Sequence, residues 1–319
     1  MDSVIALADL QSIYSVAEVD RAAEDGAARR NDGLKSWYDR MRELGGSRYI
    51  IKPSTAAAVD ELHETSPNFG NVVDDLRKYL ALAIAGNEAV QFTPLLLLGE
   101  PGLGKTYFAK KLAQALGTGF EFVSMSSLTA GWILTGASAQ WNNARPGKVA
   151  HTLIDGEFAN PVVVLDEIDK AGGDSRYDPM GALYTLLERD TAAHFKDEFI
   201  DVDMDASHIL WIATANDESM IPEPILNRMN VYAIDRPDAA GARTIALAVY
   251  HEILDAHRWP FPPEPTESVL ERLAAVPARD MRKLLLDAFG TARLANRDYL
   301  VPEDIDAKKL CGRKARVGF

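Results

Sequence analysis

A glycine-rich segment in the first half of the chain has the residue types that bind phosphate. It reads Gly99-Glu100-Pro101-Gly102-Leu103-Gly104-Lys105-Thr106 and matches the pattern G-x-x-x-x-G-K-[ST]. Glycines let backbone N–H groups converge on phosphate oxygens, and a helix that follows them adds its positive N-terminal end. The Lys105 ammonium can neutralise β- and γ-phosphates, and the Thr106 hydroxyl can ligate Mg²⁺. The segment therefore predicts a site for a nucleoside triphosphate and Mg²⁺.

Two adjacent acids follow an apolar run further along the chain. Val162–Leu165 is rich in β-branched residues, which predicts a buried strand, and Asp166 and Glu167 follow it. The Asp166 carboxylate can join the Mg²⁺ shell, and Glu167 can orient and deprotonate an attacking water. Taken alone, the pair is equally consistent with a solvated strand end. Its position after a second buried strand, 61 residues beyond Lys105, favours a hydrolytic site.

A third polar group follows another apolar run. Ile209–Ala213 predicts a buried strand that continues into Thr214-Ala215-Asn216. Ligands of open α/β sheets bind at the carboxyl ends of the strands, where the Asn216 amide can position a water near the γ-phosphate. The alternative interpretation is an asparagine that caps a turn.

The elements between these motifs alternate between strands and helices. The short run Leu95–Leu98 and the segment Phe120–Met125 predict strands, whereas 105–116 and Met180–Leu187 predict helices. A further amphipathic helix, with an apolar residue at every fourth position from Val72 to Ile84, ends at Gly86. Such alternation is typical of an α/β fold, in which helices cover both faces of a parallel sheet.

The two ends of the chain differ from this pattern. After about Pro237 the strand signals fade, and Ala239–His257 and Ser268–Leu294 predict helices joined by a proline-rich segment. The first 60 residues predict helices and loops, with a glycine turn before the extended piece Arg48–Lys52. We therefore expect an N-terminal region over 1–60, an α/β nucleotide-binding domain over 61–236, and a small helical domain with a basic tail over 237–319.

Composition excludes several classes of protein. The chain has 319 residues, of which 47% are apolar and 25% are charged, and this excludes a disordered or collagen-like chain. One cysteine, Cys311, permits no intrachain disulfide and fits a reducing, cytoplasmic location. We expect no signal peptide, because the N-terminus carries Asp2 and no basic segment, and no membrane span, because no apolar run approaches about 20 residues. A net charge of −13 argues against a broad nucleic-acid surface, although residues 306–319 carry +4.

The motifs together resemble those of AAA+ ATPases, and most closely those of the ATPase module of Lon proteases. The segments that carry the resemblance are Gly99–Thr106, Arg145–Lys148, Leu165–Lys170, Asp178–Pro179, Ile212–Asn216 and Ile221–Met229. They lie in a stretch that resembles the module from about Phe69 to Asp304. The resemblance implies a P-loop NTPase sheet followed by a helical lid, with ATP and Mg²⁺ as ligands.

The resemblance also implies an assembly. Arg228 matches the arginine finger, which reaches the γ-phosphate bound to a neighbouring subunit, so the family resemblance implies a ring, typically a hexamer. Arg279 matches sensor 2, a lid arginine that contacts the nucleotide, although Arg282 is a rival for that position. The alternatives are a surface arginine at 228 and a structural arginine at 279.

Two aromatic residues match positions that face the central pore in Lon-type rings. Trp141 precedes Arg145-Pro146-Gly147 as the aromatic that grips the substrate does, but Asn142 replaces the usual aliphatic neighbour. Tyr177 lies in a second, glycine-rich stretch, 171–178. A tryptophan buried in the flank of the sheet and a plain surface loop are the respective alternatives.

The departures from Lon concern the rest of the protein. The chain stops at Phe319, soon after the end of the lid-like segment, so we expect no Ser–Lys protease domain. These features predict a ring-forming ATPase that remodels or unfolds protein substrates without proteolysis. An ATP-controlled scaffold or regulatory assembly module is the alternative, and a DNA-acting motor is a third interpretation that the acidic charge disfavours.

Overall fold

The computed structural model describes residues 7–24, 31–127, 131–141, 143–171 and 180–306. These residues form two compact units. The first contains the described residues within 1–59, 74–99 and 106–233, and the second contains those within 60–73, 100–105 and 234–319. Asn142, the pair Asp178–Pro179 and the predicted pore residue Tyr177 lie outside the described residues, as do Cys311 and most of the basic tail.

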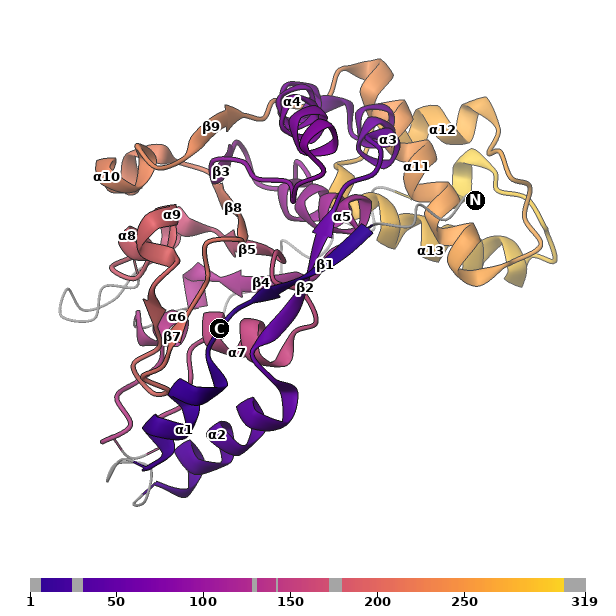
Figure 1. The fold of residues 1–319 in the computed structure, drawn as a ribbon. Coiled ribbons are helices and arrows are strands. Elements are labelled where there is room, and N and C mark those ends of the chain that lie inside the picture. Colours follow the sequence, from indigo (N-terminus) through magenta and orange to yellow (C-terminus); the bar gives the residue numbers. More distant parts are fainter. Residues whose placement is uncertain (1–6, 25–30, 128–130, 142, 172–179, 307–319) are drawn as a thin grey trace, which may run out of the picture. The chain divides into compact units, whose positions relative to one another are not determined.

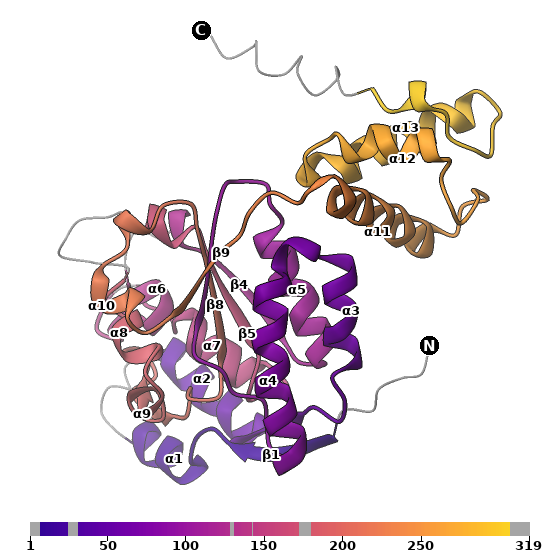
Figure 2. The same cartoon turned by 90° about the horizontal axis from the view of Figure 1, so that it is seen from above.

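A five-stranded parallel sheet is the centre of the first unit (Figure 1). Its strands are β3 (Leu95–Leu98), β4 (Phe120–Ser124), β5 (Val162–Asp166), β8 (Leu210–Ala215) and β9 (Asn230–Ala233), in the order β4-β5-β8-β3-β9. Figure 2 shows helix α5 on one side of this sheet and α7 on the other. The predicted α/β fold with a parallel sheet is therefore confirmed, although β9 was not predicted.

The helices predicted over 105–116 and up to Gly86 form in the first unit, whereas most of its short helices were not predicted. The helix bounds are α3 (Ala57–Thr65) and α4 (Gly70–Gly86), which pass from one unit to the other, then α5 (Lys105–Leu116), α6 (Trp132–Thr135), α7 (Lys148–Asp155), α8 (Leu183–Leu186), α9 (Arg189–Ala192) and α10 (Glu223–Leu226). Gly117 ends α5 with a positive φ of 71°, which glycine adopts without a Cβ penalty. The helix predicted over Met180–Leu187 is wrong in extent, because only the single turn α8 forms there.

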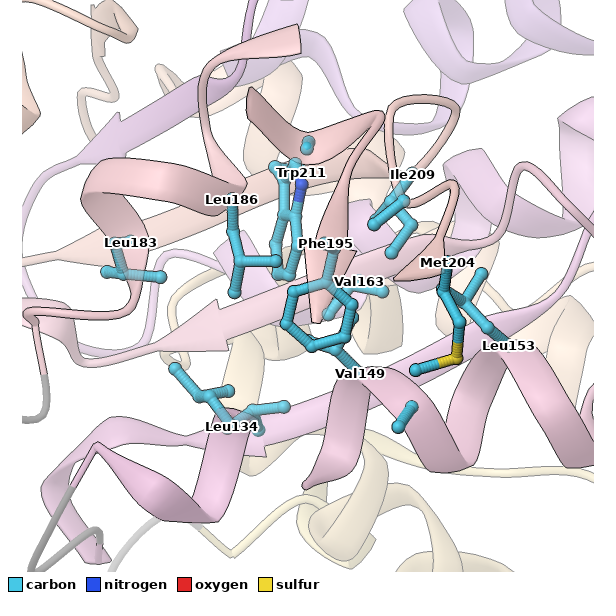
Figure 3. Close-up of a cluster of buried hydrophobic side chains, with 14 of the residues drawn as sticks. Leu134, Val149, Leu153, Val163, Leu183, Leu186, Phe195, Met204, Ile209 and Trp211 are labelled. Atoms are coloured by element: carbon cyan, nitrogen blue, oxygen red, sulfur yellow. The ribbon is translucent and has the colours of Figure 1, made fainter. Parts of the chain in front are cut away.

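Apolar side chains from the sheet, its helices and a hairpin form the core of the first unit (Figure 3). The hairpin strands β6 (Phe195–Lys196) and β7 (Asp203–Met204) contribute Phe195 and Met204, which are both buried. They pack in one cluster with Trp211 of β8 and Val149 of α7. Full burial of a side chain of this size contributes about 1.5–3 kcal/mol. The cluster therefore fixes the hairpin and α7 relative to the sheet.

The N-terminal segment joins the same core. Strand β1 (Leu7–Ser12) pairs antiparallel with β2 (Ser47–Lys52), and helices α1 (Val16–Glu24) and α2 (Asp32–Leu44) lie between them in the chain. The predicted extended piece after the glycine turn is confirmed as β2, whereas β1 was not predicted. Tyr38 and Met41 of α2 are buried in the cluster that contains Trp211.

Three helices form a separate core in the second unit. They are α11 (Ala239–His257), α12 (Glu267–Ala274) and α13 (Ala278–Leu294). The prediction of one helix over Ser268–Leu294 is wrong, since α12 ends before Pro277, which lacks an N–H and disfavours a helical residue in front of it. In the described part of the chain, no helix is long and apolar enough to cross a membrane.

Candidate nucleotide site

The phosphate-binding loop connects β3 to α5. Gly102 and Gly104 both have φ of +89°, a region that other residues rarely adopt, so the loop depends on glycine at these positions. The Lys105 side chain is buried, and its Nζ donates a hydrogen bond to the Glu100 carbonyl at 3.0 Å. The local structure is the strand, loop and helix that the motif predicts.

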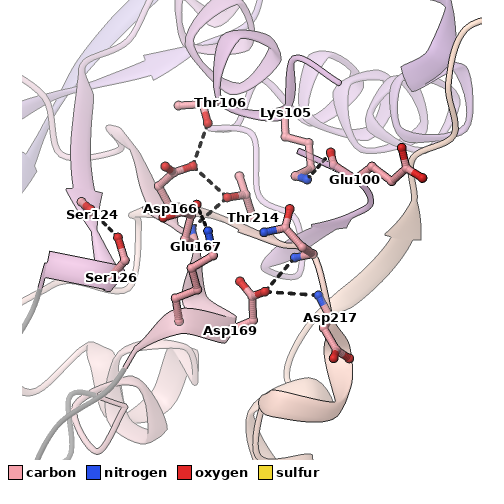
Figure 4. Close-up of polar contacts among 12 residues, drawn as sticks. Glu100, Lys105, Thr106, Ser124, Ser126, Asp166, Glu167, Asp169, Thr214 and Asp217 are labelled. Atoms are coloured by element: carbon pink, nitrogen blue, oxygen red, sulfur yellow. Dashed lines mark hydrogen bonds and ion pairs between the residues drawn. The ribbon is translucent and has the colours of Figure 1, made fainter. Parts of the chain in front are cut away.

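Oxygen atoms meet at the carboxyl ends of β5 and β8 (Figure 4). The Thr106 hydroxyl donates to Asp166 Oδ1 at 2.7 Å, and the Thr214 hydroxyl donates to the same oxygen at 2.8 Å. A hydroxyl and a carboxylate are hard oxygen ligands of the kind that Mg²⁺ prefers, so Thr106 and Asp166 fit the predicted metal site. Thr214 was not predicted as a site residue, because a threonine in a buried strand gives no distinct signal.

Glu167 has an unusual backbone conformation directly after Asp166. Its φ is +55°, in the left-handed region, and its N–H donates to the Thr214 hydroxyl at 3.0 Å. The Glu167 carboxylate pairs with Lys170 and raises the pKa of that lysine. Such a conformation costs of order 1–3 kcal/mol and recurs at functional sites. Because of this sharp turn, Asp166 contacts the two threonine hydroxyls whereas Glu167 contacts Lys170. The two adjacent acids can therefore have separate roles, one in metal binding and one as a base.

Asn216 follows β8, and its backbone is fixed by the turn after β5. The N–H groups of Asn216 and Asp217 donate to Asp169 Oδ2 at 3.1 and 3.2 Å. Asp217, rather than Asn216, caps the next turn by accepting the Ser219 N–H at 2.9 Å. Asp169 therefore ties the Glu167 turn to the end of β8. The sequence analysis missed this role, although Asp169 belongs to the same motif.

Arg228 follows the short helix α10 and contacts groups of its own chain. Its Nε lies 2.9 Å from Glu188 Oε1, and its guanidinium carbon lies 5.8 Å from the centre of the Tyr184 ring. Its Nη1 donates to the Pro224 carbonyl at 2.5 Å. About a quarter of the side chain is exposed, at 26%. A contact of this arginine with a neighbouring subunit stays a prediction.

The two candidate arginines of the lid, Arg279 and Arg282, have different contacts in the second unit. A Cβ at Gly102 would lie 3.2 Å from Cδ of Arg279, so this side chain packs against the phosphate-binding loop. Arg282 instead pairs with Glu252 of α11 at 3.0 Å. This geometry favours Arg279 over Arg282 as the lid residue that contacts the nucleotide, and the role itself stays a prediction.

The predicted pore residue Trp141 lies on a loop between α6 and α7. Its side chain is 54% exposed, so the alternative of a tryptophan buried in the flank of the sheet is wrong. Two turn-like hydrogen bonds hold its backbone, from its N–H to the Ser138 carbonyl at 2.9 Å and from the Ala144 N–H to its carbonyl at 3.3 Å. An exposed, rigid, amphipathic ring is suited to contact with a partner molecule.

A protein-family model matches the part of the chain that contains this site. Residues 95–234, which contain the loop, both acids and Arg228, match the model of the ATPase family associated with various cellular activities, AAA. These residues match the model of an AAA ATPase domain and are called the AAA domain below. The match implies nucleotide binding and agrees with the fold and motifs described above.

The curated relatives of this AAA domain include Lon proteases. The chain is 32% identical over 260 residues to Lon protease 1 of Thermus thermophilus, covering 77% of this chain and 31% of that protein. It is 34% identical over 217 residues to the Lon protease of Malacoplasma penetrans, covering 68% and 28%. The chain thus spans less than a third of the length of these relatives, and the match concerns the ATPase region.

A solved structure supports the fold of the AAA domain and lid. The Thermotoga maritima RuvB Holliday junction branch migration motor superposes with a TM-score of 0.50 at 18% identity, covering 74% of this chain and 66% of that chain. At this identity the likeness shows the fold alone.

A buried carboxylate lies in the AAA domain away from the nucleotide motifs. Asp197 is fully buried, and burial raises its pKa to about 6 although the N–H groups of Gly147, Phe199 and Ile200 hydrogen-bond to it and lower its pKa. The folded protein therefore binds this proton below about pH 6, whereas the unfolded chain binds it only near the ordinary value of 3.8. The contribution of Asp197 to stability consequently falls as the pH rises from about 4 to 6.

This raised pKa predicts that the difference in unfolding free energy between the wild type and Asp197→Asn depends on pH. Between pH 7 and pH 4 the unfolding free energy of the wild type should rise by about 2 kcal/mol relative to that of the variant, because Asp197 of the unfolded chain is itself partly protonated at pH 4. Urea unfolding of both proteins across this range measures it. A constant difference would contradict the shift, and the carboxyl ¹³C resonance of Asp197, with an expected midpoint near pH 6, provides a readout that needs no variant.

Proposed function

We propose that the chain is an ATPase that assembles into rings, typically hexamers, and uses ATP hydrolysis to remodel or unfold protein substrates without cleaving them. The observation that supports it most strongly is the cluster of Thr106, Asp166 and Thr214 with Glu167 beside it. It supports the proposal because the two residues predicted to bind the metal lie next to a separate carboxylate that can act as a base. We also propose a cytoplasmic location, and the division into 1–60, 61–236 and 237–319 stays a prediction.

The proposed reaction is attack of water on the γ-phosphate of ATP, which breaks the bond from the γ-phosphorus to the bridging oxygen and releases ADP and inorganic phosphate. Lys105 and the loop N–H groups would bind the phosphates, and Thr106 and Asp166 would hold Mg²⁺, which neutralises charge on the phosphate oxygens. Glu167 would leave Lys170, accept a proton from the water and so generate the nucleophile. Asn216 would orient that water. Arg228 of the neighbouring subunit would stabilise the charge that develops in the transition state.

Two features connect hydrolysis to a protein substrate. Arg279 packs against the phosphate-binding loop, so loss of the γ-phosphate can change the contacts of the lid. Trp141 offers an exposed aromatic surface that can hold an extended chain of varied sequence. In this proposal the lid moves with the nucleotide state, and the Trp141 loop moves the substrate. Tyr177 would contribute a second contact.

Substitution of Trp141 tests the protein-remodelling proposal. Trp141→Ala is expected to remove most of the stimulation of ATP hydrolysis by an unstructured protein such as casein, because the gripping surface is lost. The melting temperature should change little, since the ring is exposed and surface substitutions usually stay within about 0.5 kcal/mol. Phosphate release with and without casein, together with a thermal melt, measures both effects.

Trp132→Ala is the matched control, because Trp132 is also an exposed tryptophan of the first unit but lies outside the loop, at 40% exposure. This variant should keep the stimulation by casein. If Trp141→Ala kept it as well, the protein-remodelling proposal would fail, and an ATP-controlled scaffold would be favoured. Intact casein on a gel after prolonged incubation is expected, because no proteolysis is proposed.

A further inference from the structure

The loop that carries Trp141 is closed at its base by a buried carboxylate. The Ala137 N–H donates to the Arg145 carbonyl at 3.2 Å, and the Gly147 N–H donates to Asp197 Oδ2 at 2.7 Å. On the other side of the base, a Cβ at Gly136 would lie only 2.3 Å from Asp197 Oδ1. The close approach leaves no space for a side chain at this position. Both ends of the loop over residues 137–146 are therefore held in fixed positions, at Ala137 and at Gly147.

A side chain from the N-terminal segment reaches the loop above this base. Asn31 Nδ2 donates to the Ala139 carbonyl at 3.0 Å, two residues before Trp141. Its other polar atom, Oδ1, accepts the Leu34 N–H at 3.1 Å and so caps α2. One amide group thus connects the start of a helix to the loop, with its donor and acceptor used for different purposes.

The helix that carries Asn31 is firmly attached to the first unit. Leu34, Tyr38 and Met41 form its buried face, and the Tyr38 hydroxyl donates to the Ile200 carbonyl at 2.8 Å. Ile200 in turn donates its N–H to Asp197 Oδ1 at 3.1 Å, the carboxylate at the base of the loop. The helix and the loop base therefore share one anchor, and Asn31 spans from the helix to the middle of the loop.

We propose that Asn31 is a positioning residue for the Trp141 loop, and that the N-terminal segment serves as a brace for the surface that contacts substrate. The functional half rests on the proposed role of Trp141. The structural half rests on the two hydrogen bonds of one amide. A braced loop is already ordered before substrate arrives, so less conformational entropy is lost on binding and more of the contact energy is available to hold the chain.

Two substitutions separate the brace from the helix cap. Asn31→Asp keeps an oxygen that accepts the Leu34 N–H but has no N–H to donate to Ala139. Asn31→Ser also keeps the cap, because serine is a strong N-cap residue. Its shorter side chain has no N–H to donate to Ala139, and it adds no charge. Both variants should melt within a few degrees of the wild type, since they lose one hydrogen bond and keep the helix cap. Asn31→Ala, which loses the cap as well, serves as the reference for a variant that is destabilised through the helix.

The readout is amide hydrogen exchange in a peptide that covers residues 137–147. Loss of one hydrogen bond is expected to speed exchange in this peptide about fivefold in both cap-preserving variants. Stimulation of ATP hydrolysis by casein should fall in the same variants, while hydrolysis without casein stays at the wild-type rate. Exchange at the wild-type rate in both variants would overturn the brace.

The outcomes also distinguish this inference from the proposed function. Faster exchange with reduced stimulation supports both halves of the proposal. Faster exchange with unchanged stimulation overturns the functional half. In that case Trp141→Ala decides the cause: if it too leaves stimulation unchanged, the substrate role of the loop fails, and if it removes stimulation, the loop works without its brace.

Discussion

Replacement of Glu167 by glutamine is expected to stop ATP turnover while leaving ATP bound. Glutamine has nearly the same size and can keep the backbone turn, but its amide cannot accept a proton from water. Loss of a general base costs on the order of 10²–10⁴-fold in rate. Binding should persist, because Lys105, Thr106 and Asp166 are unchanged. Calorimetric titration of ATP and a phosphate-release assay measure the two properties separately.

A second glutamate provides the matched control. Glu121 pairs with Lys148 at 2.9 Å, much as Glu167 pairs with Lys170, but it belongs to β4 and lies outside the motifs. Glu121→Gln therefore removes a comparable exposed ion pair, worth about 0–1 kcal/mol, and should hydrolyse ATP like the wild type. Normal turnover by Glu167→Gln would remove the water-activating role from Glu167. Loss of binding would place this residue in nucleotide recognition instead.

Arg228→Ala is expected to have a comparable or larger effect on hydrolysis. Removal of an arginine finger costs roughly 10³-fold or more in related phosphoryl-transfer enzymes, because the charge that develops on the γ-phosphate in the transition state is then left to Lys105 and Mg²⁺ alone. The affinity for ATP should change little, since the proposed contact completes the site of another subunit. Arg228→Lys should fail similarly, because an ammonium lacks the planar fork of donors. Hydrolysis rates and ATP affinities of both variants test this.

The contacts of Arg228 within its own chain require a control. Glu188→Gln removes the ion pair at 2.9 Å and leaves the guanidinium in place. Because Glu188 is half exposed, this change should have little effect on stability, and hydrolysis should stay within a few-fold of the wild type. If Glu188→Gln lost as much activity as Arg228→Ala, the arginine would act through its own chain rather than as a finger.

The phosphate site and every strand of the sheet except β9 could be predicted from the sequence because their signals are local. Leu95–Leu98 and Val162–Leu165 are short apolar runs that only a buried strand accommodates, and the glycines of the phosphate-binding loop have a fixed spacing before Lys105. The end of α12 has a local signal as well, Pro277, which the prediction of one helix over Ser268–Leu294 overlooked. The exposed position of Trp141 was not, because a lone tryptophan is compatible with a core or a surface.

The remaining features depend on partners that are distant in sequence. Strand β1 has no clear alternation and exists through its pairing with β2. Asp197 lies in an acidic stretch that suggests a solvated loop. In the structure it is fully buried, and its carboxylate accepts hydrogen bonds from three backbone N–H groups. Asn31 reads as an ordinary helix cap, and its bond to Ala139 joins residues 108 positions apart. Local sequence patterns carry no information about such contacts.

A mixture of two inactive variants tests the shared ATP site most directly. Lys105→Ala subunits cannot bind ATP but still offer Arg228, whereas Arg228→Ala subunits bind ATP but lack the finger. In randomly mixed rings about a quarter of the head-to-tail interfaces combine an intact pocket with an intact arginine. Phosphate release should therefore reappear in mixed rings. Native mass spectrometry shows whether the rings contain both variants. Mixed rings that remain as inactive as either variant alone would contradict a site completed by a neighbouring subunit.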